Sequence, residues 1–183
     1  MTALTPDYYI PPGESDTVVE RMIIVPFVGG MLRDETMAAV HASGEAYLTV
    51  PINPDDPYEY AAQFRQWWNL PMDLVIVEQD IVPTLEQIDQ LTAHPHDWTA
   101  MAYHVGDGRY ATGLGFCKIT AALRQRRPHG GVNASLDPAN ARELVHYTSL
   151  NENVERHLTR LGEHQTVLPG KVVHLHYPEP SGA

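Results

Sequence analysis

The chain has 183 residues, of which 43% are hydrophobic and 19% are charged, a composition typical of one globular domain. Its formal net charge of −11 excludes a protein that binds nucleic acid through its general surface, and a single cysteine excludes an internal disulfide or a cysteine-based zinc site. No apolar run reaches the length of a membrane span and the N-terminus has no secretory signal pattern, so we expect a cytoplasmic protein.

Apolar runs bounded by turn residues predict strands, and helical spacing of apolar residues predicts helices between them. The predicted strands cover residues 21–27, 45–50, 73–83, 98–105 and 171–176. The predicted helices cover residues 32–42, 58–68, 121–123 and 139–161, and a further helix begins at Pro83. This alternation predicts an α/β fold with a mostly parallel sheet flanked by helices. We expect one domain over residues 21–178, a loosely ordered arm at 1–20 and a flexible tail at 179–183.

The run at residues 73–83 has the most informative polar residues of the chain. Glu78 and Asp80 stand two positions apart at its end, so on a strand both would point to one face and Gln79 to the other. Two neighbouring carboxylates are unfavourable unless a cation or hydrogen-bond donors compensate them. Ligands of open α/β sheets bind beyond the carboxyl ends of the strands. The pair therefore predicts a metal or substrate site.

A second polar pattern, His174 and His176, ends the last predicted strand and would also share one face. Carboxylate oxygens with one imidazole suit Mn²⁺ or Mg²⁺ that also holds a phosphate, whereas two histidines and a carboxylate suit zinc or non-haem iron. We therefore predict a metal site formed by Glu78, Asp80, His174 and His176.

Four short segments follow one another in an order typical of a known enzyme family: Ile24-Val25-Pro26-Phe27, Glu78-Gln79-Asp80, Gly113-Leu114-Gly115-Phe116 and His174-Leu175-His176. With these segments the chain resembles, over residues 21–178, a small nucleotide-sugar glycosyltransferase of the GT-A fold, of a kind familiar among phage-encoded enzymes. The resemblance implies a Rossmann-like sheet and an acidic Asp-x-Asp-type motif in which Glu replaces the usual first Asp.

The resemblance also implies the roles of particular residues. The nucleotide would be held by the end of the first strand, at Pro26, Phe27 and Val28, together with Gln79. The segment Gly113, Leu114 and Gly115 would match the acceptor-side segment of the family and complete the donor site. A histidine near the C-terminus would complete the metal site, with His176 favoured over His174. The donor would be a nucleotide-diphosphate sugar, with a UDP-sugar favoured, and the acceptor would be a modified DNA base, a glycan or a protein.

The implied mechanism uses Mn²⁺ or Mg²⁺ at Asp80, directed by Glu78, to neutralise charge on the departing diphosphate. An inverting enzyme also needs a carboxylate base beside the acceptor hydroxyl, and Glu152 in the long helix is the candidate. A retaining enzyme needs no such base, and both mechanisms remain open. The basic cluster at Arg124, Arg126 and Arg127 is where a DNA acceptor would bind.

Two other functions agree with the same residues. One is a metal-dependent phosphoester hydrolase that uses the same carboxylate and histidine ligands. The other is a nucleotide-binding module without catalytic activity. A serine hydrolase of the G-x-S-x-G type and a P-loop enzyme are disfavoured because neither motif occurs in the sequence.

Overall fold

The computed structural model describes residues 8–11, 19–29, 31–105, 109–128 and 146–175. His176, the predicted tail and most of the predicted arm lie outside these ranges. Within them, the chain forms one nine-stranded sheet with helices on both faces. No helix in the described ranges combines the length and the apolar character that crossing a membrane requires.

The strands lie in the order β1-β3-β2-β4-β8-β6-β9-β5, and β7 pairs with β6. Their bounds are Tyr8–Tyr9 (β1), Arg21–Val28 (β2), Tyr47–Ile52 (β3), Asp73–Val77 (β4), Ile81–Val82 (β5), Trp98–His104 (β6), Tyr110–Ala111 (β7), Phe116–Ile119 (β8) and Thr166–His174 (β9). The centre of the sheet is apolar on both faces, because β2 and β4 consist almost entirely of buried aliphatic residues. A strand buried on both faces has this composition.

The sheet is mixed, which corrects the prediction of a mostly parallel sheet. Parallel pairing joins β3 to β2, β2 to β4 and β6 to β9, whereas the other neighbouring strands are antiparallel. Parallel neighbours need a crossover of about a dozen residues or more. Only residues 105–109 separate β6 from β7, and residues 112–115 separate β7 from β8. The first of these connections reverses the chain, and both β7 and β8 run antiparallel to β6, so β8 lies antiparallel between β4 and β6.

The predicted strand at residues 73–83 is in fact two strands joined by a turn. β4 ends at Val77, opposite the first residue of β8, and the N–H of Ile81 donates to the carbonyl of Glu78 at 3.0 Å. The acidic residues therefore lie in a turn, and the alternation of a strand does not govern the direction of Gln79. β5 then leaves β4 and pairs with β9 at the far edge of the sheet.

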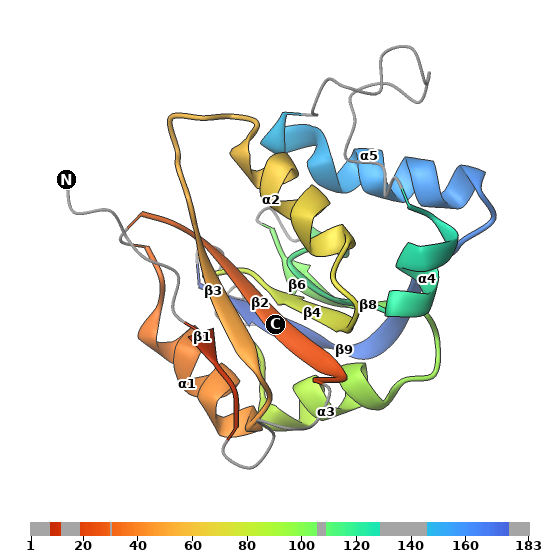
Figure 1. Cartoon of the computed structure of the whole chain (residues 1–183). Coiled ribbons are helices and arrows are strands. Elements are labelled where there is room, and N and C mark those ends of the chain that lie inside the picture. Colours follow the sequence, from red (N-terminus) through yellow and green to blue (C-terminus); the bar gives the residue numbers. More distant parts are fainter. Residues whose placement is uncertain (1–7, 12–18, 30, 106–108, 129–145, 176–183) are drawn as a thin grey trace.

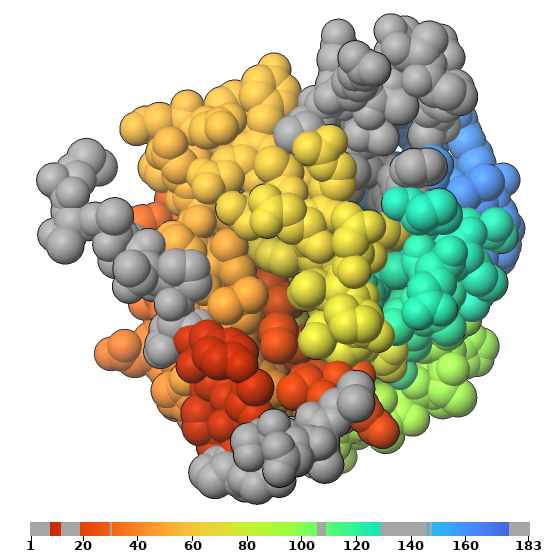
Figure 2. All heavy atoms as spheres, viewed as in Figure 1, coloured from red at the N-terminus to blue at the C-terminus, as the bar shows by residue number. Residues whose placement is uncertain are grey.

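Five helices of the described part of the chain cover the sheet in two layers (Figure 1). They are Asp34–Ser43 (α1), Glu59–Trp68 (α2), Leu85–Ala93 (α3), Ala121–Arg126 (α4) and Tyr147–Arg160 (α5). α2, α4 and α5 pack on one face, where Ile24 and Ile76 point, and α1 and α3 pack on the other, where Ile23 and Val75 point. α2 and α4 lie side by side on the first face (Figure 2). The fold is thus a three-layer α/β/α sandwich.

The helix boundaries follow local chemistry. Thr84 is the N-cap of α3 and forms a reciprocal capping box with Gln87, so Pro83 precedes the helix and is not its first residue as predicted. The predicted stop of the long helix is confirmed, because Gly162 follows α5 with φ of 82°. This left-handed conformation lets the N–H of Glu163 donate to the carbonyl of Leu158 at 3.0 Å.

Candidate functional site

A pocket of about 420 Å³ lies where the parallel strands β2, β3 and β4 end. Its lining residues are Pro26, Phe27, Val28, Met31, Ile52, Asn53, Pro54, Asp56, Tyr60, Glu78, Gln79, Asp80 and His174. β2 has β3 on one side and β4 on the other, and the connecting helices α1 and α2 cover opposite faces of the sheet. The pocket therefore lies at a topological switch point, which is where open α/β sheets bind their ligands.

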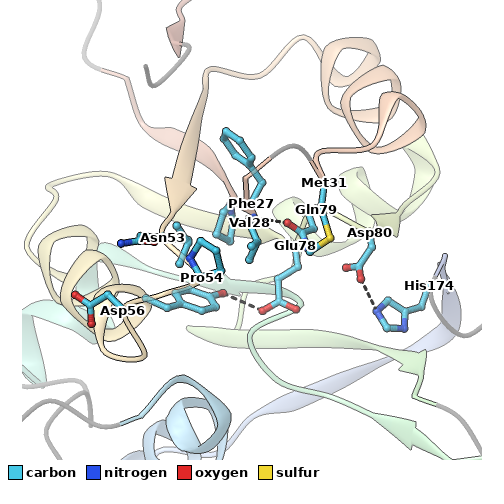
Figure 3. A pocket seen from close by; sticks show the side chains of 13 residues that line it. Phe27, Val28, Met31, Asn53, Pro54, Asp56, Glu78, Gln79, Asp80 and His174 are labelled. Atoms are coloured by element: carbon cyan, nitrogen blue, oxygen red, sulfur yellow. Dashed lines mark hydrogen bonds and ion pairs between the residues drawn. The ribbon is translucent and has the colours of Figure 1, made fainter. Parts of the chain in front are cut away.

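Asp80 and His174 form a contact at one end of this pocket (Figure 3). The antiparallel pairing of β5 with β9 brings them together, since Ile81 pairs with His174 and the N–H of Leu175 donates to the carbonyl of Asp80 at 2.9 Å. The Nε2 atom of His174 lies 3.1 Å from Oδ2 of Asp80. Both residues are buried, with exposed fractions of 7% for Asp80 and 9% for His174.

The surroundings of the His174 ring fit a cation at this contact. Nδ1 lies 2.8 Å from the carbonyl oxygen of His104, which only accepts, so Nδ1 is the protonated nitrogen. In the neutral ring the lone pair of Nε2 then faces the Asp80 carboxylate, and this contact becomes favourable when a second proton or a metal cation lies between the two atoms. Two ligand atoms at about 2.1 Å from an octahedral metal lie roughly 3.0 Å apart, close to the observed separation.

The described residues contain no group of three or more His, Cys, Asp or Glu side chains arranged to hold a metal ion. Mg²⁺ and Mn²⁺ are usually held by one or two protein ligands together with substrate phosphates and water. Asp80 and His174 therefore fit these ions as a pair. The predicted ligand His176 lies outside the described residues, so the structure gives no position for it.

Glu78 faces the middle of the pocket and has a different partner. The hydroxyl of Tyr60, on α2, donates to Oε1 of Glu78 at 2.9 Å. Burial raises the pKa of Glu78 to about 7, the hydrogen bond from Tyr60 opposes this rise, and the negative charge of Asp80 adds to it. A carboxylate with a pKa near neutrality exchanges protons readily at physiological pH, which suits a general acid or base.

Gln79 lies between these two acids and contacts the opposite side of the pocket. Its side-chain oxygen accepts from the N–H of Val28 at the end of β2, at 2.5 Å (Figure 3). Its main-chain carbonyl accepts from the hydroxyl of Thr36 at 2.9 Å and from the N–H of Arg33 at 3.3 Å. All three residues of the acidic turn line the pocket, so the predicted outward direction of Gln79 is wrong.

The other predicted site residues lie away from the pocket lining. Gly115 accepts from the N–H of Glu78 at 2.9 Å and packs against Tyr103, where an added Cβ would lie 2.6 Å from the ring. Gly113 faces Asn151 of α5, whose side-chain oxygen accepts from the N–H of Leu114 at 3.1 Å. The structure thus gives these glycines packing roles beside the acidic turn.

Glu152 does not line the pocket. Its side chain is 76% exposed on α5, with Arg156 one turn away at 3.9 Å. The residue of α5 that contacts the segment beside the acidic turn is the preceding Asn151, which also donates to the carbonyl of Thr112 at 3.3 Å.

The basic side chains predicted to bind a DNA acceptor, and the nearby Lys118, are occupied by structural contacts. Arg124 is 2% exposed, and its guanidinium donates to four carbonyl oxygens at the end of α2 and just after it, those of Trp67, Trp68, Leu70 and Met72. Burial lowers its pKa to about 10. Lys118 is 3% exposed and donates to the carbonyls of Thr92 and His94. Arg126 and Arg127 pair with Glu163, and Arg126 also with Asp97. The predicted basic surface is therefore largely neutralised.

Sequence reasoning missed several residues of the pocket. Tyr60 is one of them, and its hydroxyl donates to Glu78. Asn53 and Asp56, in the turn after β3, line the end of the pocket away from Asp80 (Figure 3). Their position directly after a parallel strand was the available signal, since the carboxyl ends of parallel strands share one edge of the sheet.

Comparisons with known proteins agree on the fold alone. No protein-family model matches the chain, and no curated protein matches its sequence. The structure is similar to that titled "Crystal Structure of A197 from STIV", with 12% sequence identity, a TM-score of 0.54 and coverage of 81% of each chain. It is also similar to a putative glucose-1-phosphate thymidylyltransferase from Bacillus anthracis in complex with a sucrose, with 7% identity, a TM-score of 0.46 and coverage of 86% of this chain and 90% of that one. At 12% identity the first similarity shows a shared α/β fold, and no argument rests on the second.

Proposed function

We propose that this protein is a glycosyltransferase of the GT-A type that moves a sugar from a nucleotide-diphosphate sugar, with a UDP-sugar favoured, to an acceptor hydroxyl. The observation that supports it best is the Asp80–His174 pair at the end of a switch-point pocket, with the spacing of two ligands of one divalent cation. The cation would be Mn²⁺ or Mg²⁺.

The charge of the pocket supports a bound cation. Asp56, Glu78 and Asp80 line it, and none of the described lining residues is Lys or Arg. An anionic diphosphate would be repelled by these carboxylates unless a positive charge compensates them. The pocket volume of about 420 Å³ lies within the range of sites for small organic ligands.

In the proposed reaction the residues of this chain would have distinct roles. Asp80 and His174 would hold the metal ion, and the bound ion supplies Lewis-acid stabilisation of the departing diphosphate. The ends of β2 and β3, with Phe27 and Asn53, would bind the nucleoside part of the donor. Glu78 would accept or release a proton beside the reacting hydroxyl, held in place by the hydroxyl of Tyr60.

A phosphoester hydrolase is the second candidate, because the position and pKa of Glu78 would serve equally well to activate a water molecule. It would use the same metal ligands without a sugar acceptor. The two functions differ in the ligand they bind. A transferase recognises the nucleotide-sugar, whereas a hydrolase of this kind would consume simple phosphoesters.

Calorimetric titration of UDP and of a set of nucleotide-diphosphate sugars, in Mn²⁺ and in EDTA, tests the proposal. We expect binding in Mn²⁺ that weakens at least tenfold in EDTA and in Asp80→Asn. Asp55→Asn is the matched control, since Asp55 is exposed in the turn after β3 and does not line the pocket. Release of UDP from the donor that binds would then distinguish an enzyme from a binding module. Absence of nucleotide binding with Mn²⁺ present, together with turnover of a phosphoester, would contradict the transferase and favour the hydrolase.

A further inference from the structure

The pocket has two lips that come from different strands. One lip is the end of β2, with Pro26, Phe27 and Val28, and the other is the acidic turn after β4. The ladder between these strands ends where Ile24 pairs with Ile76. Beyond that pair the two strands separate, and the opening between them forms the pocket.

The direction of the backbone N–H groups of β2 determines which of them can donate a hydrogen bond to the opposite lip. The N–H of Ile23 donates to Ala46, beside β3, so the N–H groups of the even-numbered residues of β2 face the β4 side. Past Ile24, the next even position is Pro26, which has no N–H. Val28 is therefore the first residue after the end of the ladder that offers a donor to the opposite lip.

The side chain of Gln79 takes this donor. Its Oε1 lies 2.5 Å from the nitrogen of Val28 and replaces the backbone carbonyl that a longer β4 would supply. Only the oxygen of an amide accepts, so this bond fixes the orientation of the side chain. On the main chain, the Gln79 carbonyl accepts from Thr36, which is completely buried in α1.

We propose that Gln79 is a positioning residue that couples nucleotide binding at the end of β2 to metal binding at Asp80. The inference rests on the proposed function. The nucleoside would contact the β2 lip, whereas the metal would be held from the turn that contains Asp80. With the Gln79 bridge in place the two lips are held in alignment, so the diphosphate of a nucleotide bound at the β2 lip would reach a cation at Asp80, and this direct contact would make each ligand strengthen the binding of the other. Without the bridge, each ligand binds its own lip but the two no longer assist each other.

The coupling is measured as a ratio of dissociation constants. The affinity for Mn²⁺ is determined by electron paramagnetic resonance of free Mn²⁺, with and without saturating UDP, and linkage makes the ratio equal to the effect of Mn²⁺ on UDP. In Gln79→Met, which keeps the side-chain length and removes the acceptor, we expect the ratio to fall about tenfold, as the loss of one partly buried hydrogen bond implies. The affinity for Mn²⁺ alone should change by less than about twofold.

Gln66→Met is the matched control, because Gln66 is exposed on α2 and does not line the pocket. Its ratio should equal that of the wild type. A wild-type ratio in Gln79→Met would overturn the inference. Absence of any UDP binding to the wild-type protein would instead refute the proposed function, and the coupling would be refuted with it.

The bridge itself has a readout that needs no ligand. In metal-free protein, hydrogen exchange of the Val28 amide, followed by NMR, should be at least about tenfold faster in Gln79→Met than in the wild type. The amide of Val25, in the centre of β2, should be unchanged. Gln79→Glu, which keeps an acceptor oxygen, should restore the protection of Val28. Equal exchange of Val28 in wild type and Gln79→Met would show that Gln79 does not bridge the lips.

Discussion

Replacing Glu78 by Gln should make the metal-free protein more stable above pH 7 and leave it almost unchanged near pH 5. Glu78 is half-buried in the pocket and burial raises its pKa to about 7. Gln has the shape of the protonated acid and cannot ionise. The substitution therefore removes the unfavourable ionisation of a partly desolvated carboxyl while keeping an acceptor for Tyr60.

The direction in which stability changes with pH follows from proton binding. The pKa of Glu78 is raised in the folded protein, from its ordinary value of 4.5 to about 7, so between these pH values the folded chain keeps a proton that the unfolded chain has lost. The free energy of unfolding of the wild type thus falls as the pH rises through this window. The rise in pKa corresponds to roughly 3 kcal/mol, which is an upper limit because the side chain retains some contact with solvent. This amount is a large part of the roughly 5–15 kcal/mol that stabilises a typical domain.

Urea denaturation in EDTA at pH values from 5 to 8.5 measures the difference between variant and wild type. We expect it to grow from near zero to about 2–3 kcal/mol in favour of Glu78→Gln. Glu152→Gln is the matched control, since the carboxylate of Glu152 is 76% exposed and the difference should stay flat. A flat difference for Glu78→Gln as well would refute the assignment of a raised pKa to this carboxyl.

Two further predictions concern the surroundings of the site. Arg124→Lys should lower the free energy of unfolding by about 2–4 kcal/mol in the same assay, because an ammonium group cannot satisfy all four main-chain carbonyls that the guanidinium binds at the end of α2 and just after it; a change below about 0.5 kcal/mol would contradict the structural role of these hydrogen bonds. Gly115→Ala should lower it by roughly 1–3 kcal/mol, because its Cβ would lie 2.6 Å from the Tyr103 ring, and a stability equal to the wild type would show that Tyr103 moves aside freely.

The part of the fold that could be predicted is the part set by apolar periodicity. The runs that became β2, β3, β4 and β6 are mostly apolar, and the helices between them have one apolar face, so the α/β class and the position of a site beyond the strand ends followed. The insertion of β8 between β4 and β6 could not be predicted in this way. Its partners β4 and β6 lie well before it in the sequence, and the only sign of its antiparallel direction is the short connection after β6.

The candidate site also has a part that the sequence predicts and a part that it does not. The acidic turn was located from two carboxylates at the end of an apolar run, and the partner of Asp80 was found among the C-terminal histidines. The hydrogen bond from Tyr60 to Glu78 joins the helix α2 to the turn after β4, and no sequence pattern predicts it. Helical geometry already argued against Glu152 as a site residue. Glu152 stands two residues, about 200°, from Leu150, which is buried against the sheet, and it therefore lies on the opposite side of the helix.

The central claim is that Asp80 and His174 hold a divalent cation that binds the diphosphate of a nucleotide in the switch-point pocket. Crystals grown with Mn²⁺ and UDP, with diffraction measured at the manganese absorption edge, test it most directly. We expect an anomalous peak within about 2.3 Å of both Oδ2 of Asp80 and Nε2 of His174, with the diphosphate oxygens completing the coordination. Nucleotide bound in this pocket without manganese at the pair, or manganese bound elsewhere, would contradict the claim.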